Sequence, residues 1–254
     1  MTDLVTRLRA AGCVFAEDEA RLLSAAAPDP ATLESMVARR VSGVPLEHVL
    51  GFADFAGVRL AVTEGVFVPR HRTELLTTTA RALLRPEATV LDLCCGTGAL
   101  GLVTVRGVPG VRLVAADLDP AAVACARTNL APVTSEVFCG DLFEPLPSDL
   151  RGRVDVLLAN VPYIPTAEIA YLPEEFRVHE ARAALDGGAD GLDIFRRLVA
   201  EVPRWLSPGG VLLSEAAPAQ LEAAHAALRA AGLTPSTITD EETETTVVLG
   251  RATR

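Results

Sequence analysis

The sequence predicts an α/β protein with a doubly wound, mostly parallel sheet, preceded by a small helical domain and a hairpin linker. From Thr89 onward, short apolar runs alternate with helical patterns, as expected for parallel strands joined by crossover helices. Residues before position 50 carry only helical patterns, and glycines divide the alternating apolar stretch that follows. The length of 254 residues and the hydrophobic content of 50% allow one sizeable domain and a smaller one.

The first region, residues 1–50, is predicted to form about three helices. Its helical patterns are interrupted by Gly12, by Pro28-Asp29-Pro30 and by Gly43-Val44-Pro45. We interpret it as a domain that recognises a macromolecular substrate. The alternative is an appendage that serves only for packing.

Residues 51–72 are predicted to form a β-hairpin linker. Apolar side chains lie close to alternation here, and Gly51, Gly57 and Gly65 mark the turns. Thr73 is the expected N-cap of a helix that runs to about Leu84. The third domain then covers residues 73–254.

The sheet of this third domain is assigned from its apolar runs. The predicted strands are 90–93, 111–116, 136–139, 154–159, 209–215, 236–239 and 245–250, and the predicted helices are 99–105, 120–130, 192–206 and 218–231. The final two strands are separated by too few residues for a helical crossover, so we expect them to pair antiparallel. The excursion from Asn160 to Gly191 is far longer than an ordinary connection, and such loops usually serve a site.

Composition excludes several classes of function. The net charge of -10 argues against an extended nucleic-acid surface, because such surfaces need many basic contacts to phosphate. No apolar run has the length of a membrane span, and the N-terminus lacks the apolar segment of a signal peptide, so a cytoplasmic location is expected. The five cysteines and four histidines lack the spacing of a disulfide framework or of a metal site.

Three acidic positions follow successive predicted strands and indicate a nucleotide-like ligand. The first belongs to Asp92-Leu93-Cys94-Cys95-Gly96-Thr97-Gly98, where a strand ends in a glycine-rich loop that opens a helix. Asp117 ends the second strand and is placed to accept hydrogen bonds from ribose hydroxyls. Asp141, with Leu142 beside it, is placed to accept from an adenine amino group, although an aspartate here also suits a simple turn cap. The first two features alone would fit a dinucleotide enzyme as well.

The tetrapeptide Asn160-Val161-Pro162-Tyr163 directly follows the fourth predicted strand. Ligands of open α/β sheets collect just beyond the carboxyl ends of such strands. The tetrapeptide offers a carboxamide acceptor, two backbone carbonyls and an aromatic face. This set is suited to holding a planar amide or amino nitrogen by its N–H groups.

With these motifs in order, the chain resembles the class I S-adenosylmethionine-dependent methyltransferases, and among them the HemK/PrmC-type protein-(glutamine-N5) methyltransferases. The resemblance covers nearly the whole chain and rests on the cofactor loop, on Asn160-Val161-Pro162-Tyr163, and on the segments 43–51, 67–74, 185–192 and 206–210. It implies a Rossmann-like class I methyltransferase sheet whose last strand is antiparallel. It also implies methylation of the glutamine in a Gly-Gly-Gln loop of a peptide chain release factor.

The same resemblance implies roles for single residues. S-adenosylmethionine would be bound by Asp92, Cys94, Cys95, Gly96, Thr97, Gly98, Asp117, Asp141, Leu142 and Asn160. Asn160, Val161, Pro162 and Tyr163 would form the catalytic clamp. Phe67 would form the wall opposite Tyr163, and Arg70 would either bind the substrate backbone or pair with Glu180 to brace the long loop, which we favour. No metal is implied.

Three departures from the family pattern bear on the substrate. Val161 replaces the usual proline, but the expected acceptor there is a main-chain carbonyl, which valine also has. Cys94 and Cys95 stand where many members have Gly-Thr, and a cysteine at the first position resembles the branch that acts on a ribosomal protein. Ala181 follows Glu180 where proline is usual. Alternatives to a release factor are therefore glutamine in a ribosomal or other protein, the amino group of adenine in RNA or DNA, and a non-catalytic cofactor-binding protein.

Overall fold

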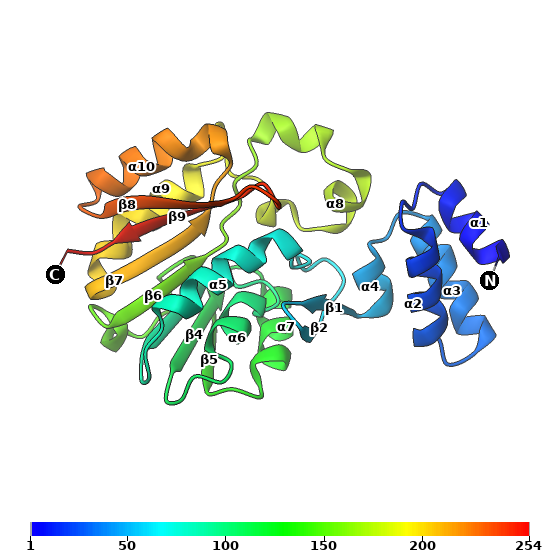
Figure 1. Cartoon of the computed structure of the whole chain (residues 1–254), viewed down its shortest axis with the longest axis horizontal. Coiled ribbons are helices and arrows are strands. Elements are labelled where there is room, and N and C mark those ends of the chain that lie inside the picture. Colours follow the sequence, from blue (N-terminus) through cyan, green and yellow to red (C-terminus); the bar gives the residue numbers. More distant parts are fainter. Residues whose placement is uncertain (1, 254) are drawn as a thin grey trace.

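The computed structural model describes residues 2–253 and is organised around one large sheet. Within these residues the sheet has seven strands in the order β5-β4-β3-β6-β7-β9-β8 (Figure 1). The strands are β3 (Thr89–Leu93), β4 (Arg112–Asp117), β5 (Ser135–Cys139), β6 (Val154–Ala159), β7 (Leu206–Glu215), β8 (Thr234–Asp240) and β9 (Thr245–Arg251). The strands β3 to β7 are parallel to one another, whereas β9 is antiparallel to both β7 and β8. The predicted fold class is confirmed.

Helices cover both faces of the sheet because its central strands are apolar on both sides. Every residue of β6 except Asp155 is buried, as is every residue of β3 after Thr89. One face packs against α5 (Glu74–Leu83), α6 (Ala99–Val105) and α7 (Pro120–Leu130). The other face packs against α9 (Asp193–Glu201) and α10 (Leu221–Ala230). The carboxyl ends of the strands remain free to form a site.

Four helices precede the hairpin and lie at the opposite end of the molecule from the C-terminal strands (Figure 1). They are α1 (Thr2–Ala10), α2 (Ala16–Ala26), α3 (Pro30–Val41) and the short α4 (Leu46–Leu50). Their buried side chains, Leu8, Leu23 and Val37 among them, form a cluster of their own. Asp29 caps α3 by accepting from the amides of Ala31 and Thr32, both at 2.9 Å, and so the break expected at Pro28-Asp29-Pro30 also starts a helix. The sequence led us to expect about three helices, and α4 is additional.

Within the predicted linker, β1 (Phe52–Phe55) and β2 (Val58–Ala61) form a two-stranded antiparallel hairpin. Phe55 and Leu60 are fully buried in the cluster that also holds α5. Asn129 on α7 accepts from the Ala61 amide at 2.8 Å and donates to the Ala61 carbonyl at 2.9 Å. The hairpin is thereby fixed to the helical layer of the sheet.

An ion-pair cluster joins the N-terminal helices to the long excursion after β6. Arg40 of α3 contacts Glu19 of α2 at 2.6 Å and Glu175 of α8 (Glu174–His179) at 2.9 Å. The Arg40 and Glu19 side chains are only 12% and 9% exposed, so the Arg40–Glu19 pair is largely withdrawn from water. The Arg40–Glu175 contact therefore holds α8 against the N-terminal helices.

Two local expectations were wrong. Thr73 occupies the position before α5, but its backbone is helical and its hydroxyl caps no amide, because a 3-10 helix over His71–Thr73 leads directly into α5. The helix expected at 192–206 ends at Glu201, since Pro203 has no N–H to donate and its ring opposes a further α-helical turn.

Candidate active site

A cavity of about 670 Å³ opens at the carboxyl ends of β3, β4 and β6. From β3 the chain continues to β4 on one side, and from β6 it continues to β7 on the other side. Doubly wound sheets bind ligands at the point where the strand order reverses in this way. The volume lies within the range of small-molecule and cofactor sites. Residues from the predicted cofactor loop, from the tetrapeptide after β6 and from the linker all line it.

The cofactor loop turns sharply between β3 and α6. Cys94, Gly96 and Gly98 all have positive φ angles, of 55°, 53° and 77°. A Cβ atom at Gly98 would also meet Leu130 of α7 at 3.1 Å, so this position is crowded as well as left-handed. The Gly96 amide donates to the carboxylate of Asp117 at 2.8 Å, which holds the loop against the end of β4.

Asp92 lies beneath this loop and does not line the cavity. Its carboxylate is fully buried and accepts the Gly101 amide of α6 at 2.8 Å. Burial raises the pKa of Asp92 to about 7, the Gly101 hydrogen bond opposes this rise, and the nearby Asp117 adds to it. A Cβ at position 101 would lie 2.9 Å from Asp92, so the glycine permits this close approach. The sequence suggested that Asp92 contacts a cofactor, whereas the structure places it as a support for the loop and helix.

The other predicted acidic residues, Asp117 and Asp141, reach the cavity wall together with Leu142. Asp117 accepts two backbone amides, and burial raises the pKa of its carboxyl. Asp141 pairs with Arg197 of α9 at 2.6 Å, so one of its oxygens is already engaged. Arg197 also lines the cavity, and its position on a helix far along the chain gave no sequence signal.

Cys94, which is half-buried, and Cys95, which is buried, lie in the same wall as free thiols. Burial raises the pKa of both thiols far above the ordinary range, and the carboxylates of Asp117 and Asp92 raise it further. Both therefore remain protonated at neutral pH. They contribute a small, weakly polar surface rather than a nucleophile.

The tetrapeptide after β6 lies against the cofactor loop within this cavity. Asn160 lines the cavity, and its side-chain oxygen is buried and accepts no hydrogen bond from the protein. Val161 is 2% exposed and follows it in the wall. The Tyr163 carbonyl accepts from Gln220 at 2.8 Å, which ties the tetrapeptide to the segment after β7. A buried, unsatisfied acceptor is costly, and in a ligand site it indicates a donor on the ligand.

The long excursion folds back onto the tetrapeptide. The amides of Ile164 and Gly187 each donate to a carbonyl on the opposite arm, at 3.1 and 2.8 Å. Gly191 has a φ of 77°, and a Cβ there would lie 2.1 Å from the Tyr163 carbonyl oxygen. Close packing on the tetrapeptide thus explains Gly187 and Gly191, whereas Gly188 is crowded by Asp193.

Arg70 and Glu180 meet at the base of this excursion. The two side chains form an ion pair, and the Glu180 carboxylate also accepts the Val68 amide at 3.3 Å. The Arg70 guanidinium lies over the rings of Phe67 and Phe176, 5.1 and 4.1 Å from their centroids. Burial raises the pKa of Glu180, and Arg70 opposes that rise. All four side chains line the cavity, Phe67 on the linker side.

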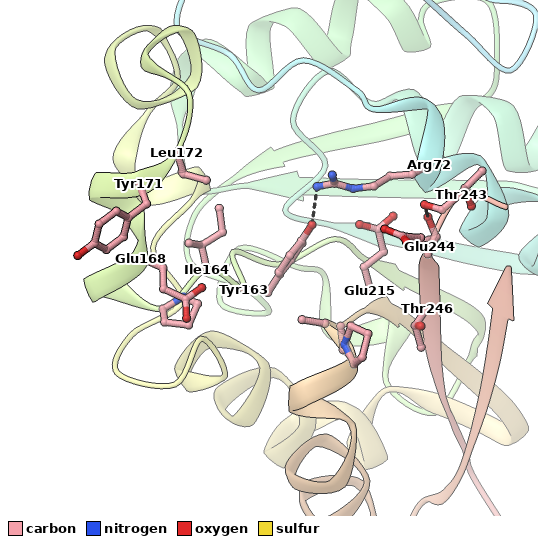
Figure 2. A pocket seen from close by; sticks show the side chains of 15 residues that line it. Arg72, Tyr163, Ile164, Glu168, Tyr171, Leu172, Glu215, Thr243, Glu244 and Thr246 are labelled. Carbon is pink, nitrogen blue, oxygen red and sulfur yellow. Dashed lines mark hydrogen bonds between the residues drawn. The ribbon is translucent and has the colours of Figure 1, made fainter. Parts of the chain in front are cut away.

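A second cavity of about 640 Å³ adjoins the first, and the two share Arg72, Tyr163, Ile164 and Leu172 (Figure 2). Arg72 donates to the Tyr163 hydroxyl at 2.7 Å. Glu215, the last residue of β7, is 5% exposed and lines this second cavity. Neither Arg72 nor Glu215 was predicted as a site residue, because each depends on contacts between distant segments.

Within residues 2–253 no group of three or more His, Cys, Asp and Glu side chains is arranged to hold a metal ion. No helix there is long and apolar enough to cross a membrane.

Comparisons with known proteins agree with the geometry of the site. The family described as Methyltransferase small domain matches residues 59–191. The chain is 42% identical to the release factor glutamine methyltransferase of Mycolicibacterium smegmatis, covering 76% of this chain and 70% of that protein. It is 38% identical to the release factor glutamine methyltransferase of Cereibacter sphaeroides, over 90% of this chain and 88% of that one.

Two other similarities are broader. The chain is 36% identical to the 4-amino-L-phenylalanine/4-methylamino-L-phenylalanine methyltransferase of Streptomyces pristinaespiralis, over 82% of this chain and 73% of that protein. A methyltransferase structure from Pyrococcus furiosus superposes with a TM-score of 0.60 at 15% identity, covering 87% of this chain and all of that one, which supports the fold. Taken with the site, these findings show that the chain belongs to the release factor glutamine methyltransferase family, whose members depend on S-adenosylmethionine.

Proposed function

We propose that the protein transfers a methyl group from S-adenosylmethionine to the side-chain amide nitrogen of a glutamine in a peptide chain release factor. The observation that carries this proposal is the buried side-chain oxygen of Asn160, a residue of the cavity wall, which has no hydrogen-bond donor among the described residues. A glutamine side chain would supply the missing N–H group. Such a substrate would place the reaction in the cytoplasm, where we expect the protein to act.

The first cavity fits S-adenosylmethionine in its volume and in its chemistry. Gly96 brings backbone close to the space beside β3, whereas Gly98 packs against α7 outside the cavity wall, and Asp117 offers acceptor oxygens at the end of β4. Asp141 and Leu142 provide an acceptor and an apolar cover at the end of β5. When bound, the cofactor supplies an electrophilic methyl group on a sulfonium. Asp92 contributes indirectly, by holding the amide of Gly101 and with it the start of α6.

The clamp residues compensate for the weak nucleophilicity of an amide. Its nitrogen lone pair is delocalised into the carbonyl, so reaction requires orientation and support for positive charge on nitrogen. We assign Asn160 Oδ1 and the Val161 carbonyl as acceptors of the two N–H groups. Acceptors fixed in advance stabilise the developing charge without reorganisation. After transfer, the nitrogen releases one proton to water, and no general base is required.

The remaining residues position the substrate amide. Tyr163 and Phe67 both line the cavity and would flank the planar group as two aromatic walls. The Arg70–Glu180 pair braces the excursion that carries the far wall. We propose that residues 1–50 contact the substrate protein, since α3 is joined to α8 through Arg40 and Glu175. In this scheme residues 51–72 link that region to the methyltransferase domain, residues 73–254.

A second candidate is transfer to the amino group of a small aromatic amine. The similarity to the 4-amino-L-phenylalanine methyltransferase favours it, because an aryl amine also presents two N–H groups to the same acceptors. Glutamine in a ribosomal protein and adenine in nucleic acid use the same geometry. The net charge of -10 weighs against adenine in nucleic acid.

The test is methyl transfer from labelled S-adenosylmethionine by the pure protein. Release factors, ribosomal proteins, RNA and 4-amino-L-phenylalanine are offered separately, and labelled protein is mapped to a residue by mass spectrometry. We expect label on one glutamine of a release factor. Label found only on RNA, ribosomal protein or the free amino acid would overturn the proposal.

The Asn160→Ala variant tests the clamp itself. We expect its transfer rate to fall at least about a thousandfold, because both orientation and charge support are lost. Its affinity for S-adenosylmethionine, measured by calorimetry, should stay close to that of the wild type. Full activity in this variant would remove Asn160 from the mechanism.

A further inference from the structure

The second cavity is not used by the proposed transfer, although it borders the clamp. Figure 2 shows Glu168, Tyr171 and Leu172 on one side and Thr243, Glu244 and Thr246 on the other, with Tyr163 and Glu215 between them. Tyr163 belongs to the wall of both cavities. Whatever occupies the second cavity therefore lies beside Tyr163, which also borders the first cavity.

Glu215 places a buried carboxyl group in the wall of this cavity. Its side chain is deeply buried, and no basic side chain in residues 2–253 forms an ion pair with it. One carboxylate oxygen accepts no well-formed hydrogen bond. Burial raises the pKa of Glu215, and the nearby Thr73 hydroxyl and Arg72 guanidinium only partly oppose that rise. Removing a carboxyl group from water without a hydrogen-bonding or charged partner destabilises the fold, and a ligand that supplies the partner would offset this loss.

Two further carboxylates stand at the rim. Glu168 and Glu244 line the same cavity, are exposed, and form no ion pair within the described residues. The only basic side chain in the lining is that of Arg72, and it donates to the Tyr163 hydroxyl. Three carboxylates thus face one guanidinium that is already engaged. The excess charge favours a cationic ligand.

Apolar side chains form much of the wall between these carboxylates, and three threonines complete it. Ile164 and Leu172 line one side, and Ala216 and Pro218 line the region near Glu215. The Tyr171 side chain is 87% exposed at the mouth, where its ring face is free to contact a cation. Apolar walls that lead to a buried carboxylate match a side chain with an alkyl stem and a charged head.

We propose that the second cavity binds an arginine or lysine side chain of the substrate protein, on the same segment as the target glutamine. The cation would pair with Glu215, with Glu168 and Glu244 attracting it to the mouth. The assignment rests on the proposed function, because it requires a protein substrate whose glutamine lies in the first cavity. It makes the cavity a specificity site next to the clamp.

The test is a double-mutant cycle between enzyme and substrate. The substrate is an intact release factor in which each arginine and lysine near the target glutamine is replaced by glutamine, one at a time. The enzymes are wild type, Glu215→Gln, the double variant Glu168→Gln/Glu244→Gln, and Glu242→Gln. Glu242 is the matched control, because it is exposed in the same turn as Glu244 but lies outside the cavity. Each pair is characterised by kcat/KM for methyl transfer.

We expect one substrate substitution to lower kcat/KM at least about tenfold with the wild type and with Glu242→Gln. The same substitution should have little further effect with Glu215→Gln, and a reduced effect with the rim double variant. The rim variant is informative even if Glu215→Gln folds poorly, since both of its positions are exposed. Independent effects of enzyme and substrate substitutions would overturn the assignment while leaving methyl transfer intact. Absence of transfer from wild type to every release factor would instead overturn the proposed function and this assignment with it.

Discussion

The Arg72 guanidinium donates a hydrogen bond of 2.7 Å to the hydroxyl of Tyr163. Arg72 precedes α5, whereas Tyr163 ends the tetrapeptide after β6, so the bond joins segments that are 91 residues apart. The Tyr163 ring forms part of the wall of both cavities. Its orientation therefore affects the first cavity and the second together.

The Tyr163→Phe variant should show what this hydrogen bond contributes. The ring remains, but it loses a contact of about 1 kcal/mol, and we expect kcat/KM for methyl transfer to fall roughly threefold to tenfold. Affinity for S-adenosylmethionine should not change. Tyr171→Phe is the control, because that side chain is 87% exposed and should tolerate the loss of its hydroxyl. Equal effects of the two substitutions would contradict a role for the Arg72 contact.

Gly191→Ala should disturb the clamp through the Tyr163 carbonyl, which packs against this glycine. The new Cβ would lie 2.1 Å from the Tyr163 carbonyl oxygen, so the excursion or the clamp must move. The control is Gly209→Ala, where φ is 79° but nothing lies within 4 Å of the added atom. Both variants carry backbone strain of about 1 kcal/mol, and only Gly191→Ala adds the clash. We expect a loss of kcat/KM of at least about tenfold for Gly191→Ala alone; similar activities would show that the segment adjusts freely.

Val161→Pro tests whether the clamp uses the main-chain carbonyl at this position. The Val161 amide is not a donor in the loop and turn hydrogen bonds of residues 2–253, so proline removes no such bond. Where the native backbone already suits proline, restricting the unfolded chain raises stability by about 0.4 to 1 kcal/mol. We expect kcat to stay within about threefold of wild type, measured beside thermal unfolding. A large loss of kcat with a stable fold would indicate that the valine side chain itself matters.

Asp92→Asn should change how stability depends on pH. The folded-state pKa of Asp92 is about 7, whereas that of an aspartate in an unfolded chain is about 4. Between these values the folded protein binds a proton that the unfolded chain does not, so stability falls as pH rises through this window. Asparagine keeps an acceptor for the Gly101 amide and cannot ionise.

The gain in stability of Asp92→Asn over wild type should therefore grow by roughly 2 to 3 kcal/mol between pH 5 and pH 8. Urea unfolding of both proteins across this range measures the difference. A difference that is constant with pH would show that Asp92 does not titrate in the window.

Arg40→Gln should weaken the junction between the helical region and α8. It leaves Glu19 buried without its partner, and we expect the free energy of unfolding to fall by about 3 kcal/mol. The control is Arg7→Gln, since the Arg7–Glu34 pair also joins two helices but is exposed to solvent. Its loss should have little effect on stability. Chemical denaturation compares the two, and equal losses would mean that burial of the Arg40 cluster is unimportant.

Much of the fold was readable from local pattern. The run predicted at 154–159 coincides with β6, and the predicted helices 99–105 and 120–130 coincide with α6 and α7. The short connection before the last strand correctly predicted an antiparallel pair. These features are encoded locally, because side-chain periodicity and glycine or proline breaks act over only a few residues.

The sequence did not predict where the last strand inserts. The strand β9 lies between β7 and β8, a position that depends on which strand edges are open after the chain has folded.

The site was likewise predictable only in part from the sequence. The motifs placed Asn160, Asp117 and the glycine loop at strand ends, and their common cavity follows from the parallel sheet.

The sequence by itself determined the order of elements, the family and the main segments that line the first cavity. Only the tertiary structure decided that Asp92 supports the loop from below, that Arg72 fixes Tyr163, and that Glu215 is buried beside the clamp. Each of these depends on contacts between residues far apart in the chain. The local sequence pattern predicts whether a residue is buried. Which residue it contacts there depends on how the whole fold packs.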